Sequence, residues 1–103
     1  MWAQLITMRV KDGSDEEVAR LLAHLRDIEQ PDSGWMRTTA MRGQADSNLV
    51  MVLAVFDSEE KARARENDPR RAEGLATLRA MMGKILDGPP QFTDLVVIDD
   101  IAA

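Results

Sequence analysis

The segment Leu49–Phe56, with the sequence LVMVLAVF, is the feature that most constrains the fold of this chain. Its residues are apolar at odd and at even positions alike. Because successive side chains of a strand point to opposite faces of a sheet, both faces of this strand need to be covered. The segment therefore predicts a strand inside a sheet with something packed against each side.

Three further segments predict strands. Trp2–Val10 is mostly apolar on both faces, Trp35–Gly43 is more polar, and Phe92–Ile101 closes the chain. The turn Ala45-Asp46-Ser47-Asn48 is short. It predicts a hairpin in which the second and third strands are antiparallel neighbours.

Two segments predict helices. Ser14 and Glu17 fit a capping box, and the stripe that follows at helical spacing ends before Pro31; its members are Val18, Leu21, Leu22, Leu25 and Ile28. The second helix begins at Ser58, is interrupted at Asp68-Pro69 and restarts there. Gly74 and Gly83 inside it indicate close packing, because glycine is a poor helix former.

The order β-α-β-β-α-β predicts a single α+β domain over residues 1–103. We expect the ferredoxin-like fold, a four-stranded antiparallel sheet with two helices on one face. Those helices cover only one face of the third strand. The other face carries Leu49, Met51, Leu53 and Val55, and an exposed apolar surface of this size predicts a homodimer formed through it.

Composition excludes several classes of protein. The 103 residues contain no cysteine and one histidine, so disulfides and thiolate sites are excluded and we predict neither a metal nor a cofactor. A net charge of −5 argues against a nucleic-acid partner. No apolar run reaches the roughly 20 residues that cross a bilayer, and no signal peptide opens the chain, so we expect a cytoplasmic protein without a membrane partner.

Two motifs carry a family resemblance. The run Phe56-Asp57-Ser58-Glu59-Glu60-Lys61-Ala62 followed by Asn67-Asp68-Pro69 resembles the passage from third strand to helix in antibiotic biosynthesis monooxygenase-like proteins. Pro31-Asp32-Ser33-Gly34-Trp35 resembles the family's turn into the second strand. The resemblance implies a homodimer in which two sheets form a dimeric α/β barrel. It also implies relatives that are cofactor-independent monooxygenases of aromatic polyketides or haem-degrading enzymes.

The chain departs from both enzymatic branches of that family. Ile6, Phe56 and Gly74 stand where the haem-degrading branch carries Asn, Trp and His, so we predict no enzymatic binding of haem. The oxygenase branch tends to have Trp at the position of Phe56 with Tyr or Asn nearby, and this chain contains no tyrosine.

His24 is the only side chain with an ordinary pKa near neutrality, which makes it the candidate catalytic base. The alternative is a half-exposed helix histidine. We expect a substrate pocket between the helices and the sheet, with an aromatic ligand stacked on Phe56 and with space left by Gly74; its predicted lining is Ile6, Met8, Phe56 and Leu78, with His24 or Trp35 at the mouth. The alternative is a solid core into which Leu75 and Met82 collapse.

Arginines are frequent in the second half of the chain. Arg63, Arg65, Arg70 and Arg71 alternate with acidic residues, which predicts a solvated helix face. Two functions remain open at this point. One is a cofactor-independent monooxygenase-like enzyme acting on a small aromatic or polyketide-like substrate. The other is a non-catalytic dimeric barrel that binds a small apolar ligand or only associates with itself.

Overall fold

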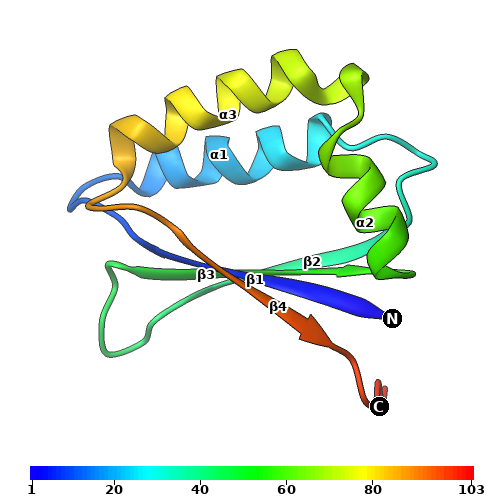
Figure 1. Cartoon of the computed structure of the whole chain (residues 1–103). Helices are drawn as coiled ribbons and strands as arrows, with labels where there is room; N and C mark the ends of the chain where they lie inside the picture. Colours follow the sequence, from blue (N-terminus) through cyan, green and yellow to red (C-terminus); the bar gives the residue numbers. More distant parts are fainter.

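The computed structural model describes residues 1–103 as a helical layer packed on one face of an antiparallel sheet (Figure 1). None of its helices is long and apolar enough to cross a membrane. The elements in chain order are β1 (Trp2–Arg9), α1 (Asp15–Asp27), β2 (Trp35–Arg42), β3 (Leu49–Phe56), α2 (Glu59–Glu66), the 3-10 turn η1 (Pro69–Arg71), α3 (Ala72–Ile85) and β4 (Gln91–Val96).

The strand order in the sheet is β2-β3-β1-β4, with every neighbouring pair antiparallel. The predicted ferredoxin-like fold is therefore confirmed. The apolar strand β3 and its partner β1 form the middle of the sheet. In Figure 1, α1 and α3 run side by side across one face, α2 lies beyond the end of β3, and the opposite face has no helix.

The last strand is shorter than the sequence predicts. It ends at Val96 rather than Ile101. Its partner β1 begins at Trp2, which pairs with Val96, and the N–H of Val97 donates to the carbonyl of Met1 at 3.3 Å. Beyond that point the chain has no strand left to pair with, and residues 97–103 form an irregular tail.

The helix starts follow the predicted residues, with one difference in bonding. Ser58 and Asp68 accept hydrogen bonds from the backbone N–H groups of Lys61 and Arg70, as capping residues do. Ser14 also precedes a helix, but the predicted capping box is wrong. Its hydroxyl turns back and donates to the carbonyl of Lys11 at 2.6 Å.

Two separate apolar clusters join the helices to the sheet. The larger one lies where α1 begins and α3 ends, and its buried members are Met8, Val10, Val18, Leu21, Val50, Val52 and Ile85. The smaller one lies under α2 and consists of Trp2, Phe56 and Ala62. The middle of the sheet, between these clusters, is left for the site described below.

The helices α1 and α3 meet closely at Gly74. Ile28 of α1 occupies the space where a β-carbon at Gly74 would lie, and His24 shares a 2.8 Å hydrogen bond with the Gly74 carbonyl. Close packing is therefore confirmed at Gly74. At Gly83 the prediction is wrong, because no atom lies within 4 Å of a β-carbon built there.

The face of the sheet turned away from the helices is apolar and open. Leu49, Met51 and Leu53 of β3 are only half-buried on it, and Met41 of β2 is exposed. This face is thus open at Leu49, Met51 and Leu53, whereas Val55, which the sequence predicts on the same face, is only 3% exposed.

The two helical glycines give a matched pair of substitutions. We expect Gly74→Ala to lower the free energy of unfolding by about 1–3 kcal/mol, because the new methyl group overlaps Ile28. Gly83→Ala should raise it by about 0.5–1 kcal/mol, since alanine is the better helix former and the space is open. Urea denaturation followed by circular dichroism measures both. Equal effects at the two positions would contradict the helix packing described here.

Candidate functional site

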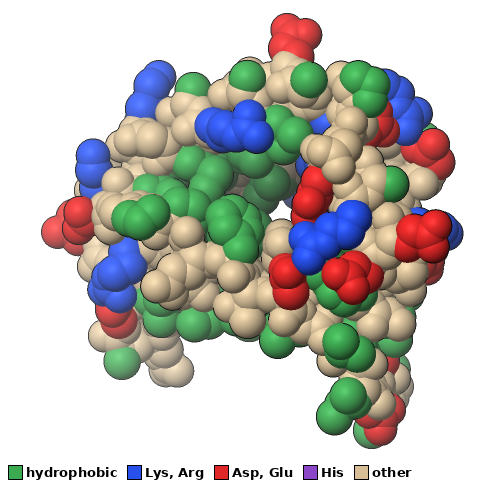
Figure 2. All heavy atoms as spheres, viewed as in Figure 1, with side chains coloured by type: hydrophobic (Ala, Val, Ile, Leu, Met, Phe, Trp, Pro, Cys, Tyr) green, Lys and Arg blue, Asp and Glu red, His purple; other side chains and the backbone are tan.

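A cavity of about 840 Å³ lies between the helical layer and the helix-facing side of the sheet. It occupies the middle of the domain and opens to solvent as the hollow seen in Figure 2, where hydrophobic side chains line its interior. Its apolar walls come from both layers: Ile6, Val52, Ala54, Phe56 and Phe92 from the sheet, and Leu22, Leu25, Leu75, Leu78 and Met82 from the helices. Such a volume suits a small organic molecule.

The residues predicted to line a pocket separate into two groups. Ile6, Trp35, Phe56 and Leu78 all line this cavity. Met8 does not, because it is buried in the larger apolar cluster. Binding of a ligand by these residues stays a prediction.

Gly74 adds no depth to the cavity, contrary to expectation. Ile28 fills the gap beside it. Leu75 and Met82, which in the alternative prediction collapse into a solid core, form part of the wall. The open volume therefore comes from the separation between α3 and the sheet.

Phe56 is not available for the predicted stacking. Its ring is only 2% exposed, the guanidinium of Arg65 lies 4.8 Å from its centre, and the Trp2 ring is tilted against it at 6.1 Å. Phe92 of β4 is 57% exposed and faces the cavity from the sheet. Trp35 and Phe92 are the aromatic rings that a ligand can reach.

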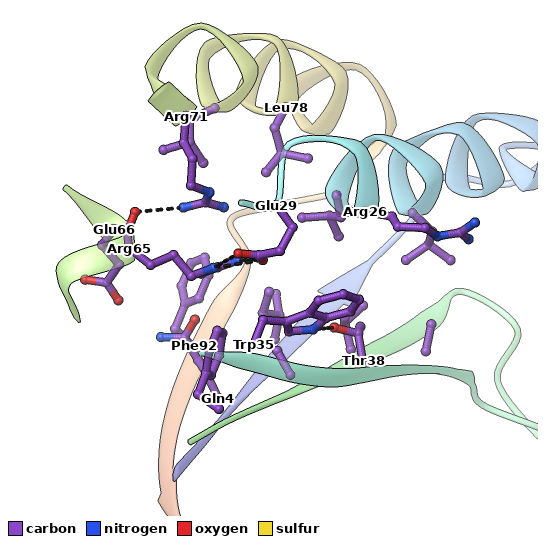
Figure 3. Close-up of a pocket in the computed structure, with 18 of the residues that line it drawn as sticks. Gln4, Arg26, Glu29, Trp35, Thr38, Arg65, Glu66, Arg71, Leu78 and Phe92 are labelled. Carbon is purple, nitrogen blue, oxygen red and sulfur yellow. Dashed lines mark hydrogen bonds and ion pairs between the residues drawn. The ribbon is translucent and has the colours of Figure 1, made fainter. Parts of the chain in front are cut away.

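Trp35 reaches the cavity because of an irregularity in β2. Trp35 pairs with Phe56 and Arg37 with Val55, so Met36 is an extra residue in the strand, a β-bulge. This shift places Trp35 on the helix-facing side together with Thr38. The indole N–H donates to the Thr38 hydroxyl at 2.7 Å, which fixes the plane of the ring (Figure 3).

A buried ion pair closes one end of the cavity. Arg65 of α2 donates through Nε to both carboxylate oxygens of Glu29, at 2.9 and 2.8 Å, and the side chains are 15% and 6% exposed. Burial raises the pKa of Glu29, but hydrogen bonds from Arg65 and Ser33 and the positive charges of Arg65 and Arg71 together hold that pKa below its ordinary value. The carboxylate is therefore ionised and is a weak base.

Arg71 lies beside this pair, and its buried guanidinium has an unused hydrogen-bond donor. The residue is 3% exposed, and its side chain extends from the end of η1 toward Glu29 (Figure 3). Nη1 donates to the backbone carbonyl of Arg65 at 3.2 Å, whereas Nε is the one buried side-chain polar atom with no hydrogen-bond partner. Burial and the charge of Arg65 lower the pKa of Arg71, and Glu29 opposes this. An arginine stays protonated nonetheless.

The prediction of a solvated face is wrong for Arg65 and Arg71, and the sequence analysis missed Glu29. The break at Asp68-Pro69 separates α2 from α3. Periodicity along one helix axis therefore says nothing about the orientation of Arg71 relative to Arg65. Glu29 follows the last turn of α1, where helical spacing no longer applies. The feature of the sequence that could have indicated this site is the helix break at Asp68-Pro69, which changes the direction of the chain between Arg65 and Arg71.

His24 lies outside the cavity lining, between α1 and α3, with its Nε2 atom on the Gly74 carbonyl. Its proposed role as a base stays a prediction, and the structure shows it joining the two helices. No group of three or more histidine, cysteine, aspartate or glutamate residues is placed to hold a metal ion.

The chain belongs to the antibiotic biosynthesis monooxygenase family, whose model matches residues 1–76. This range includes the cavity-lining parts of the sheet in β1 to β3, the Glu29–Arg65 pair and Arg71. No curated protein matches the chain significantly in sequence.

Solved structures share the fold at low sequence identity. A Caulobacter crescentus CB15 protein whose name places it among the antibiotic biosynthesis monooxygenases is 15% identical, with a TM-score of 0.76 over 95% of this chain and 90% of its own. A Nitrosomonas europaea protein of unknown function is 20% identical, with a TM-score of 0.74 over 99% and 93%. Rv0793 from Mycobacterium tuberculosis is 15% identical, with a TM-score of 0.74 over 98% of both chains.

Replacing Glu29 tests the buried ion pair. At pH 7 we expect Glu29→Gln to lower the free energy of unfolding by about 3 kcal/mol, because Arg65 and Arg71 lose their buried counter-charge. The folded pKa of Glu29 lies below its ordinary value of 4.5. The wild-type advantage is thus complete above that pH and disappears as the pH falls through the folded pKa. Urea denaturation from pH 7 to pH 3 measures this.

The control for that experiment is Asp32→Asn, which removes the exposed partner of Arg70. An exposed ion pair contributes little, so its loss should change stability far less than the loss of Glu29. A wild-type advantage over Glu29→Gln that persists unchanged at pH 3 would show that the carboxylate charge is not what stabilises this end of the cavity.

Proposed function

We propose that this protein is a cofactor-independent monooxygenase that acts on a small planar substrate bound in the cavity. The observation that carries the proposal is an open apolar cavity of about 840 Å³ with two reachable aromatic rings, Trp35 and Phe92, in a chain of the monooxygenase family. Flat rings favour planar ligands, because stacking adds to the gain from apolar burial.

The chemistry follows from what the cavity offers. A methylene group next to a conjugated ring system loses a proton to give a carbanion, which reduces O₂ itself. The balanced reaction turns the CH₂ group and O₂ into a carbonyl group and H₂O. The cavity contains cations that stabilise a substrate anion, while its buried carboxylate Glu29 is already paired with Arg65. The substrate is therefore one whose C–H bond is acidic without a strong protein base.

A non-catalytic, ligand-binding function is the second candidate, because one observation favours it. The chain has no tyrosine, and its single histidine lies outside the cavity lining. A non-catalytic barrel that binds a small apolar ligand needs only the cavity. Ligand binding without O₂ consumption distinguishes this function from the enzymatic one.

Anthrone, a planar tricyclic molecule with an activated methylene group, tests both functions. We expect it to quench the fluorescence of Trp35 and to be oxidised to anthraquinone with one O₂ consumed per molecule, as measured with an oxygen electrode. Trp35→Phe should abolish the quenching. Trp2→Phe removes a buried indole away from the cavity lining and should leave the quenching intact. Quenching without O₂ consumption above the buffer rate would support the non-catalytic function.

We further propose that two copies associate through the sheet face that has no helix. Met41 and Leu95 are exposed there, and Met51 and Leu53 are half-buried. An apolar surface of this kind is unfavourable in water. The exposed apolar residues Ile98 and Ile101 of the C-terminal tail add to the surface that a second copy would cover.

Met51→Glu tests the association. At micromolar concentration the wild type should have twice the 11.5 kDa monomer mass by light scattering after size exclusion, and Met51→Glu should have the monomer mass. The control is Ala80→Glu, which adds the same charge on the exposed side of α3. A monomeric wild type, or a control that dissociates equally, would contradict the proposed interface.

A further inference from the structure

The arginines of this chain fall into two groups, those that form an ion pair with a carboxylate and those that do not. Seven of the ten arginines form ion pairs within 4.0 Å, and three do not. The three without a carboxylate partner are Arg26, Arg71 and Arg79, and all three line the cavity. In a protein with a net charge of −5, every arginine without a carboxylate partner thus lies in the walls of one apolar cavity.

Arg71 is the most informative of the three because it is buried. An exposed arginine is satisfied by water, whereas a buried one depends on protein acceptors. Arg71 has one, the carbonyl of Arg65, which Nη1 contacts. The opposite edge of the guanidinium, formed by Nε and Nη2, donates to no protein atom. That edge presents two parallel N–H groups, the geometry that matches the two oxygens of a carboxylate.

The nearest protein carboxylate is already engaged. Glu29 accepts both of its short hydrogen bonds from Arg65, so it balances one of the two buried charges and leaves the other. Five arginines and two glutamates line the cavity in total. The positive surplus lies beside apolar walls and reachable aromatic rings, and this combination suits a ligand that is both planar and anionic.

We propose that the ligand of this cavity is an aromatic carboxylate whose anionic group binds Arg71 while its rings lie against Trp35 and Phe92. The inference rests on the proposed function for the identity of the site and adds the chemical class of the ligand. The Nε atom is buried and has no hydrogen-bond partner, so an acceptor that reaches it adds a hydrogen bond without breaking one within the protein. The Glu29–Arg65 pair keeps a second cation in place and prevents Arg71 from turning to the protein's own carboxylate.

The test compares 2-naphthoate with 2-naphthamide, two planar molecules of nearly the same shape that differ in charge. By isothermal titration calorimetry, the wild type should bind the naphthoate at least tenfold more tightly than the amide. Arg71→Met should reduce this preference to about onefold and leave binding of the amide unchanged. Its melting temperature should equal or exceed that of the wild type, because the variant removes an unsatisfied buried cation. A purely structural role for Arg71 would instead lower the melting temperature.

Arg20→Met is the matched control, since it removes an exposed arginine of α1 that does not line the cavity. It should keep the full preference for naphthoate. Arg71→Lys should keep part of it, because lysine supplies the charge without the paired N–H groups.

A measurement on the wild type keeps the test independent of the folding of the variants. The ¹⁵N–¹H signal of the Arg71 Nε group should shift when naphthoate is added and stay in place with the amide. Equal affinity for the two probes would overturn the inference and leave the cavity as a site for planar ligands. Failure of both probes to bind would overturn the inference and the proposed function together. Tight naphthoate binding by a protein that does not oxidise anthrone supports the inference and contradicts only the oxygenase activity.

Discussion

The ion pair between Glu29 and Arg65 connects three elements, α1, α2 and β3, at one end of the molecule. Arg65 donates Nε to both oxygens of Glu29, which fixes the end of α1 relative to α2, and its guanidinium also lies over the ring of Phe56 in β3. The other end of α1 packs into the larger apolar cluster through Val18 and Leu21. The helix is thus held at both ends, and the space between these supports is the cavity.

Burying these charged groups costs folding free energy. The Arg71 side chain is buried and those of Arg65 and Glu29 are largely so. Replacing buried ion pairs by apolar groups of similar volume is often neutral or stabilising by about 1–4 kcal/mol. The helix pair does not need them, since Ile28 against Gly74 and the hydrogen bond of His24 already hold α1 to α3. Retention of charge at such a position is typical of sites that bind or react rather than of structural cores.

The sequence predicted the fold because the fold depends on local patterns. The apolar run Leu49–Phe56, the helical stripe from Val18 to Ile28 and the break at Asp68-Pro69 each determine one element or its boundary. The end of β4 was not predictable from its own residues, because it is set by where β1 begins. The apolar wall of the cavity could be predicted from the parity of strand residues. The meeting of Arg65, Arg71 and Glu29 could not, because they come from three separate parts of the chain and no periodicity in the sequence encodes the angles between those parts.

The bulge at Met36 makes the cavity dependent on the register of β2 and not only on its side chains. Upstream of the bulge the alternation of β2 is reversed, so Trp35 shares a face with Thr38 although the two are three positions apart. Deleting Met36 alone would leave Trp35 opposite Phe56 on the helix-facing side, whereas regular pairing of every residue of β2, without the bulge, would turn the indole to the side where copies are proposed to meet. The contact of Trp35 with the cavity therefore depends on the register of β2 as well as on the side chain, and a change elsewhere in the strand that abolishes the bulge would exchange a ligand contact for a subunit contact without replacing Trp35.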